Sequence, residues 1–175
     1  MKLTPTTEKY ILHWGEMGTR WGTNRTVAQI HALLYLSPDP LPADEIVELL
    51  GVARSNVSNS IRELQSYGII KTVHLMGDRR DHFEATHDLW ELFMQILEER
   101  KRREVDPTLT MLRECVIDAD NDKAINEKTK QRIKRMLEFT ETMTDWYTEV
   151  RTIPKPTLVK LMKLGSRVVK FLPSK

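Results

Sequence analysis

The spacing of apolar residues changes at Gly68, and this change limits the folds open to the chain. Before it, apolar residues recur every three or four positions over 6–20, 23–36, 43–50 and 54–67, which predicts helices. After it, residues 69–76 are β-branched and roughly alternating, 77–81 form a charged turn, and 82–85 can return as a strand. Helical spacing resumes over 88–103, 107–118, 123–150 and 155–171. We therefore expect a mainly α protein with one small β-hairpin.

Residues 43–67 have the pattern of a helix-turn-helix, and the hairpin that follows makes it a winged helix. Gly51 separates the two short helices, and Val57, Ile61 and Leu64 are expected on the buried side of the second one. Its outer face would carry Ser55, Ser58, Asn59, Arg62 and Ser66, flanked by Arg54 and Asn56. A polar stripe is usually a solvated helix face, but the preceding helix and the arginine-bearing hairpin favour contact with DNA.

The side chains in this region match the chemistry of a DNA duplex. Arginine and asparagine form paired hydrogen bonds with guanine and adenine edges, and serine contacts either a base or a phosphate. A narrow minor groove attracts inserted arginine. We predict major-groove contacts from Arg54, Ser55, Asn56, Ser58, Asn59 and Arg62, minor-groove contacts from Arg79 and Arg80, and a phosphate contact from Lys71. An ordinary charged turn is the other interpretation of residues 77–81.

These motifs resemble a known family. Residues 50–58, 61–64 and 68–70 resemble the recognition-helix region of the MarR superfamily, and Asp78-Arg79-Arg80 is similar to its Asp-x-Arg wing motif. Trp14, Trp21, the segment 77–85 and Asp88-Leu89-Trp90 resemble the GbsR branch of choline-responsive and betaine-related repressors. One departure is Ala53, where such helices commonly carry a serine cap.

The resemblance implies a domain organisation and a mode of action. Residues 23–87 would bind DNA, while the N-terminal helix (1–22) and the helical region 88–175 would form the dimer and ligand region. A homodimer would place two recognition helices in successive major grooves of a pseudo-palindromic operator. Independently, the apolar surface of the helices after residue 87 exceeds what one small winged helix covers; a larger monomeric core is the competing interpretation. The expected function is that of a repressor released by a small ligand.

The aromatic residues suggest where that ligand would bind. Aromatic faces attract quaternary ammonium groups, and the resemblance makes choline or a related cation the leading candidate. The candidate residues are Trp14, Trp21, Tyr35, Trp90, Trp146 and Tyr147. Ordinary packing is the alternative role for these side chains.

Other functional classes find little support. The five histidines lack metal-ligand spacing, Cys115 is the sole cysteine, and neither a phosphate-binding glycine loop nor a Gly-x-Ser-x-Gly elbow occurs. We therefore expect no enzyme activity, cofactor or metal, and the lack of a signal peptide or an apolar run of membrane-spanning length predicts a cytoplasmic protein. The basic amphipathic segment 156–175 would support the dimer or lie on an anionic membrane. The alternative function is a winged-helix protein–protein assembly module without specific DNA binding.

Overall fold

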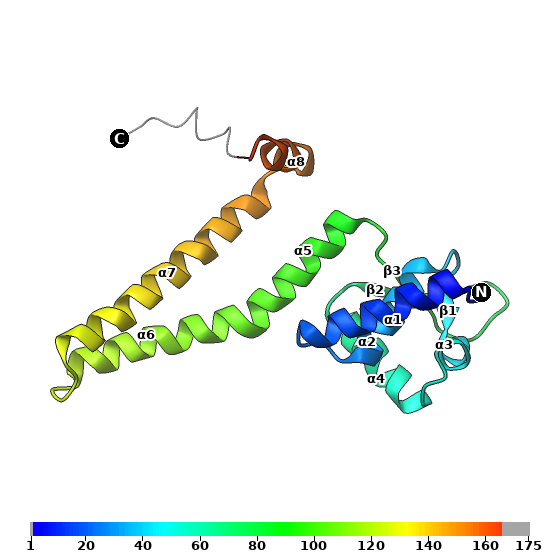
Figure 1. The fold of residues 1–175 in the computed structure, drawn as a ribbon, viewed down its shortest axis with the longest axis horizontal. Helices are drawn as coiled ribbons and strands as arrows, with labels where there is room; N and C mark the ends of the chain where they lie inside the picture. The colour runs from blue at the N-terminus through cyan, green and yellow to red at the C-terminus, as the bar shows by residue number, and fades with distance from the viewer. Residues whose placement is uncertain (1, 166–175) are drawn as a thin grey trace. The chain divides into compact units, whose positions relative to one another are not determined.

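The chain forms two compact units, Met1–Ile96 (the N-terminal unit) and Leu97–Lys175 (the C-terminal unit). This computed structural model describes residues 2–165 and is drawn in Figure 1. It is mainly helical with one small antiparallel sheet, which confirms the predicted fold class. The predicted helix over 155–171 is described only as far as α8, Lys155–Leu164, and positions 166–171 lie outside the described residues.

Two packed helices begin the N-terminal unit. In α1 (Pro5–Arg20), Thr4 caps the first turn by accepting a hydrogen bond from the Thr7 amide, and α2 (Arg25–Leu36) is capped in the same way by Asn24. The helices approach closely, because a Cβ on Gly18 would lie 2.4 Å from the Cβ of Ala28. The inner face of α2 supplies much of the core, including the fully buried Ile30 and Leu33.

The helix-turn-helix follows as predicted. The first helix, α3 (Ala43–Leu50), ends at Gly51, whose left-handed backbone (φ 62°) favours glycine. The second helix, α4 (Arg54–Ser66), buries Val57, Ile61 and Leu64 against this core. The core therefore fixes which face of α4 remains outside.

The wing is part of a three-stranded sheet rather than an isolated hairpin. Strands β2 (Ile70–Val73) and β3 (His82–Ala85) pair antiparallel, and a two-residue strand β1 (Leu41–Pro42) pairs with the other edge of β3 in the order β1-β3-β2. The register sets Val73 and Pro42 opposite His82. Because β3 is the central strand, the base of the wing is held from both sides.

After the sheet, the elements of the described residues are helices, with one difference from the prediction. Asp106-Pro107 does not interrupt the helical path: α5 (Leu89–Arg100) continues through a π-helical segment, Lys101–Val105, into α6 (Asp106–Asn121). The wider π turn accommodates the proline, which would otherwise collide with a carbonyl of the preceding turn.

Within the C-terminal unit, α6 packs along α7 (Glu127–Thr152), as Figure 1 shows. Arg113 of α6 donates hydrogen bonds of 2.9 and 3.0 Å to Glu141 of α7. No residue of α7 is buried. Among the described residues, no helix combines the length and the apolar character needed to cross a membrane.

Candidate DNA-binding surface

The six major-groove candidates all lie on the exposed side of α4. They are Arg54, Ser55, Asn56, Ser58, Asn59 and Arg62, and each is exposed. Arg62 donates a hydrogen bond to the side-chain oxygen of Asn59, and Arg54 forms an ion pair with Asp44 of α3. Ala53 precedes the helix without making a side-chain cap, so serine capping is missing here as the sequence indicated.

The wing carries the other three candidates. Lys71 on β2 lies 3.3 Å from Glu84 on β3. Arg80 donates to both carboxylate oxygens of Asp78, with Nε at 3.0 Å from each and Nη2 at 2.6 Å from Oδ2. Hydrogen bonding from Arg80 holds the pKa of Asp78 well below its usual range, and so keeps this carboxylate ionised.

Three residues outside the predicted DNA contacts organise this surface. Gln65 of α4 donates a hydrogen bond of 2.9 Å to the hydroxyl of Thr72 on β2, linking the helix to the wing. His82 is buried at the base of the wing, where its ring contacts Asp78 and the Arg80 carbonyl. The alternating pattern of residues 69–76 predicted that Thr72 lies in a strand. Nothing in that pattern indicated that Gln65 is its hydrogen-bond partner.

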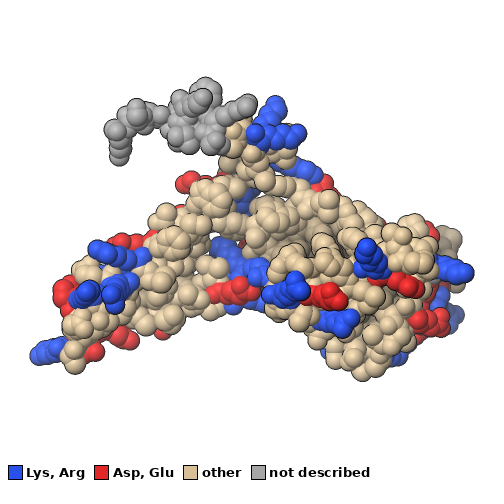
Figure 2. Space-filling view, viewed as in Figure 1, with Lys and Arg blue, Asp and Glu red and all other residues tan. Residues whose placement is uncertain are grey.

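The charge of the surface is partly balanced. Arg54, Lys71 and Arg80 each lie beside an acidic side chain, whereas Arg79 is exposed and has no ionic partner among the residues described. Cationic and acidic side chains are likewise interspersed on the face of the N-terminal unit that Figure 2 shows. Exposed ion pairs are weak, so these cations can exchange a carboxylate for a phosphate at small cost.

Two of the candidate ligand residues line a small cavity in the N-terminal unit. Trp14 and Tyr35 contribute to its wall, and its volume is about 30 Å³. The remaining lining residues are Tyr10, His31, Ala32, Leu89 and Leu92. Tyr10 stacks on Trp14 with ring centroids 5.5 Å apart, and Tyr35 lies 6.4 Å from the His31 ring. The cavity wall is therefore mainly aromatic and aliphatic.

His31 is the polar exception in this wall. Its Nε2 atom is buried without a hydrogen-bond partner among residues 2–165, and burial lowers the pKa of His31 to about 4. The ring is therefore neutral at physiological pH.

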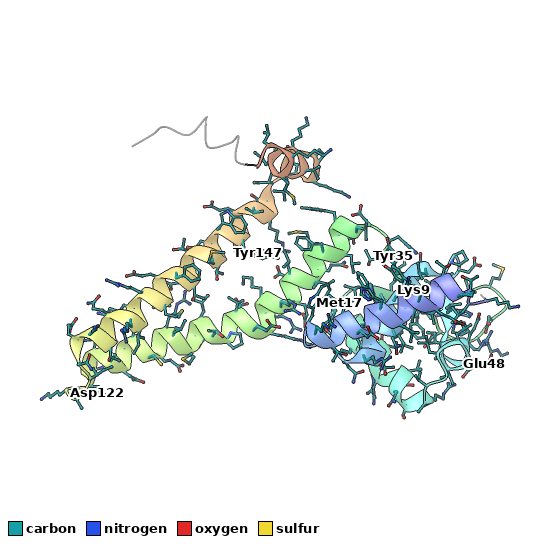
Figure 3. The ribbon with its side chains drawn as sticks, viewed as in Figure 1. Lys9, Met17, Tyr35, Glu48, Asp122 and Tyr147 are labelled. Atoms are coloured by element: carbon teal, nitrogen blue, oxygen red, sulfur yellow. The ribbon has the colours of Figure 1, made fainter. Side chains whose placement is uncertain are left out.

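The other four aromatic candidates occupy different surroundings. Trp21 lies edge-on to Trp14 at 6.4 Å and is 56% exposed, and Trp90 packs against Phe93 at 5.8 Å. Trp146 and Tyr147 belong to α7 in the C-terminal unit, where the Tyr147 hydroxyl donates to Glu98 at 3.1 Å. Figure 3 labels Tyr35 on α2 and Tyr147 on α7.

Comparison with known proteins identifies relatives of this chain. No family model matches it. The chain is 25% identical over 133 residues to the HTH-type transcriptional repressor GbsR of Bacillus subtilis (strain 168), covering 72% of this chain and 73% of that protein. The HTH-type transcriptional repressor OpcR of the same organism is 24% identical over 76 residues, covering 43% of this chain and 41% of that protein.

A solved structure gives independent support for the fold. It is described as the crystal structure of a transcriptional regulator, and it matches with a TM-score of 0.66 and 17% identity, covering 83% of this chain and 95% of that one. Its likeness extends over most of both chains. In sequence and fold, the chain is therefore similar to MarR-like winged-helix transcriptional regulators of the GbsR-like branch.

Proposed function

We propose that this regulator recognises a specific DNA sequence through the exposed side of α4 and the β2–β3 wing. The observation that carries the proposal is the orientation of α4: its apolar side is fixed in the core, while six polar side chains able to contact bases or phosphates lie outside. The Gln65–Thr72 hydrogen bond supports a fixed relation between helix and wing.

In this mechanism the parts of the surface have separate tasks. Arg62 and the two asparagines of α4 read base edges in the major groove, and the serines contact bases or phosphates. Arg79 and Arg80 enter the adjacent minor groove, and Lys71 contacts a phosphate. Arg54, Lys71 and Arg80 leave their present carboxylate partners for the duplex when DNA binds.

We further propose that two copies of the chain act as a homodimer on a pseudo-palindromic operator. The support is an exposed apolar stripe on α7, formed at helical spacings of three and four by Met136, Phe139, Met143 and Trp146. A second copy would cover this stripe, and the dimer would set its recognition helices roughly 34–36 Å apart.

The protein is proposed to be a repressor released by a small ligand, with choline or a related cation as the first candidate. Support comes from the GbsR-like branch and from the cavity, where Tyr10, Trp14 and Tyr35 supply aromatic faces. Choline is larger than this cavity and must widen it to bind. It releases DNA only if it binds the widened form more tightly than the form that binds DNA. Calorimetry should detect choline binding to the native protein and weaker binding to Trp14→Leu; no heat with choline or its analogues contradicts this assignment.

The partly balanced charge of the surface favours one competing function, a protein–protein assembly module. Arg62→Ala separates the two functions. A DNA binder should lose about 1–3 kcal/mol of affinity and discriminate less at the base that Arg62 reads, whereas an assembly module should be indifferent. Lys9→Ala on α1 is the matched control, because it removes an exposed cation that lies outside α4 and the wing. Equal losses in both variants would indicate general charge attraction instead of a recognition surface.

A further inference from the structure

His82 is a buried residue at the base of the wing whose ring meets two hydrogen-bond acceptors. It begins β3 and is only 4% exposed. Its Nδ1 atom lies 3.0 Å from the carbonyl oxygen of Arg80, and its Nε2 atom lies 3.4 Å from Oδ2 of Asp78. The backbone at His82 is held from both sides, because β3 pairs with Val73 along one edge and with Pro42 along the other.

The chemistry of these two partners distinguishes the neutral ring from the protonated one. A carbonyl oxygen and an ionised carboxylate accept hydrogen bonds and cannot donate them. A neutral imidazole carries one N–H and can satisfy only one of the two partners, leaving the lone pair of its other nitrogen facing an oxygen. The protonated ring carries an N–H on each nitrogen, so it can donate to the carbonyl and also face the carboxylate as a cation. The geometry therefore distinguishes the two charge states of His82.

The carboxylate that His82 meets is the same one that holds the wing arginine. Arg80 donates from Nη2 to Oδ2 of Asp78 at 2.6 Å, and the Arg80 amide donates to Oδ1 at 2.9 Å. With a neutral ring, the cluster of Asp78, Arg80 and His82 has no net charge. With a protonated ring it carries one positive charge, and two cations share the carboxylate.

Of the remaining charged groups around the cluster, Arg79 has no ionic partner among the residues described, and the others are arranged in pairs or lie on α3. Glu45 of α3 interacts electrostatically with Arg80. In the same loop, His74 lies 3.7 Å from Asp81, and Lys71 and Glu84 pair farther along the strands. Among these histidines, His82 is the one that contacts Asp78 itself.

We infer that His82 is a positioning residue that couples the protonation state of the wing to its affinity for DNA. Protonation gives Asp78 a second cationic partner, so Asp78 balances less of the positive charge that Arg80 presents to the minor groove, and affinity rises as the pH falls. This inference rests on the proposed binding of DNA by the wing. It adds a role for a residue that does not itself reach the duplex.

Fluorescence anisotropy at pH 6 and pH 8 over a series of salt concentrations tests the inference. For the unsubstituted chain, the slope of log affinity against log salt should be steeper at pH 6, by about 0.9 for each engaged wing, because each wing then brings one more uncompensated positive charge to the DNA. His82→Gln should abolish this difference. His74→Gln, which removes an exposed histidine of the same loop, should retain it. A pH difference that survives in His82→Gln, or that disappears in His74→Gln, overturns the inference.

A second measurement keeps the inference separate from the proposed function. Nuclear magnetic resonance of the ¹⁵N-labelled histidine rings follows His82 in the free protein. Asp78→Asn should change how the ¹⁵N chemical shifts of the His82 ring depend on pH, and should leave those of His13 on α1 unchanged. An unchanged His82 signal overturns the coupling. If no variant binds DNA at either pH, the proposed function fails, and the ring signals still decide whether His82 and Asp78 are coupled.

Discussion

Gly18 shows how a single residue controls the packing of α1 on α2. A methyl group at this position would lie 2.4 Å from the Cβ of Ala28, well inside van der Waals contact. Gly18→Ala should therefore lower the free energy of unfolding by about 1–3 kcal/mol, the usual cost of overpacking, despite the better helix propensity of alanine. Urea denaturation measures this change. Lys9→Ala, at an exposed position of the same helix, should stay within about 0.5 kcal/mol, and equal midpoints for the two variants would contradict the close packing.

His31 makes stability depend on pH in the acidic range. Burial lowers its pKa from 6.5 to about 4, so between these values the unfolded chain binds the proton more readily than the folded one. Its contribution to stability is complete above pH 6.5 and is lost as the pH falls toward 4, by up to about 1.4 kcal/mol per pH unit.

Replacing the ring by an uncharged one tests this dependence. His31→Phe should flatten the fall in unfolding free energy between pH 6.5 and pH 4.5, measured by urea denaturation at several pH values. The variant also removes the unpartnered Nε2 atom from the core. A wild-type fall that persists undiminished in His31→Phe would assign the acid sensitivity to other groups.

At this scale the sequence predicted which side chains face outward but not what they contact. The helical spacing of Val57, Ile61 and Leu64 was enough to put Arg62 and Asn59 on the outer face of α4. The pairing of Arg54 with Asp44 and of Lys71 with Glu84 depends on distances between elements, which local spacing does not encode. The two contacts of His82 were missed for the same reason, since a lone histidine in a strand gives no signal of its partners.

Among the elements, α4 has a start that can be improved. Ala53 occupies the N-cap position with extended backbone and makes no side-chain cap. Ala53→Ser would supply the missing acceptor for an amide of the first turn, and should raise the unfolding free energy by about 0.5–2 kcal/mol. Urea denaturation checks the gain, and Ala53→Val, which also enlarges the side chain but cannot cap, is the control. A serine variant no more stable than the valine variant would contradict the assignment of this position as the cap.

The helices were more predictable than the short or irregular elements between them. The helical stretches are long enough for their period to stand out, and the glycines at 51 and 68 mark two of their ends. Strand β1 has two residues, too few to show a period, and it forms only because β3 offers a free edge. The π-helical segment before Pro107 was missed because proline usually ends a helix, whereas here the wider turn removes the collision.

Two copies of the whole molecule are expected to form a homodimer. The apolar stripe of α7 is exposed in a single copy, and the dimer should have twice the chain mass of 20.5 kDa in light scattering at micromolar concentration. Phe139→Arg, in the middle of the stripe, should shift the protein toward the monomer. Glu138→Arg adds the same side chain outside the stripe and should leave the mass unchanged. A wild-type mass near that of one chain would contradict the dimer.

Recognition of a particular DNA sequence by the whole molecule can be tested by one comparison of affinities. Fluorescence anisotropy of the purified protein would compare DNA from its own upstream region with a random duplex of equal length, at two salt concentrations. The proposed function predicts that the affinity for the upstream DNA exceeds that for the random duplex by at least ~10³-fold, the range of specific regulators. Equal, weak and strongly salt-dependent binding to both duplexes, or no binding to either, would contradict it.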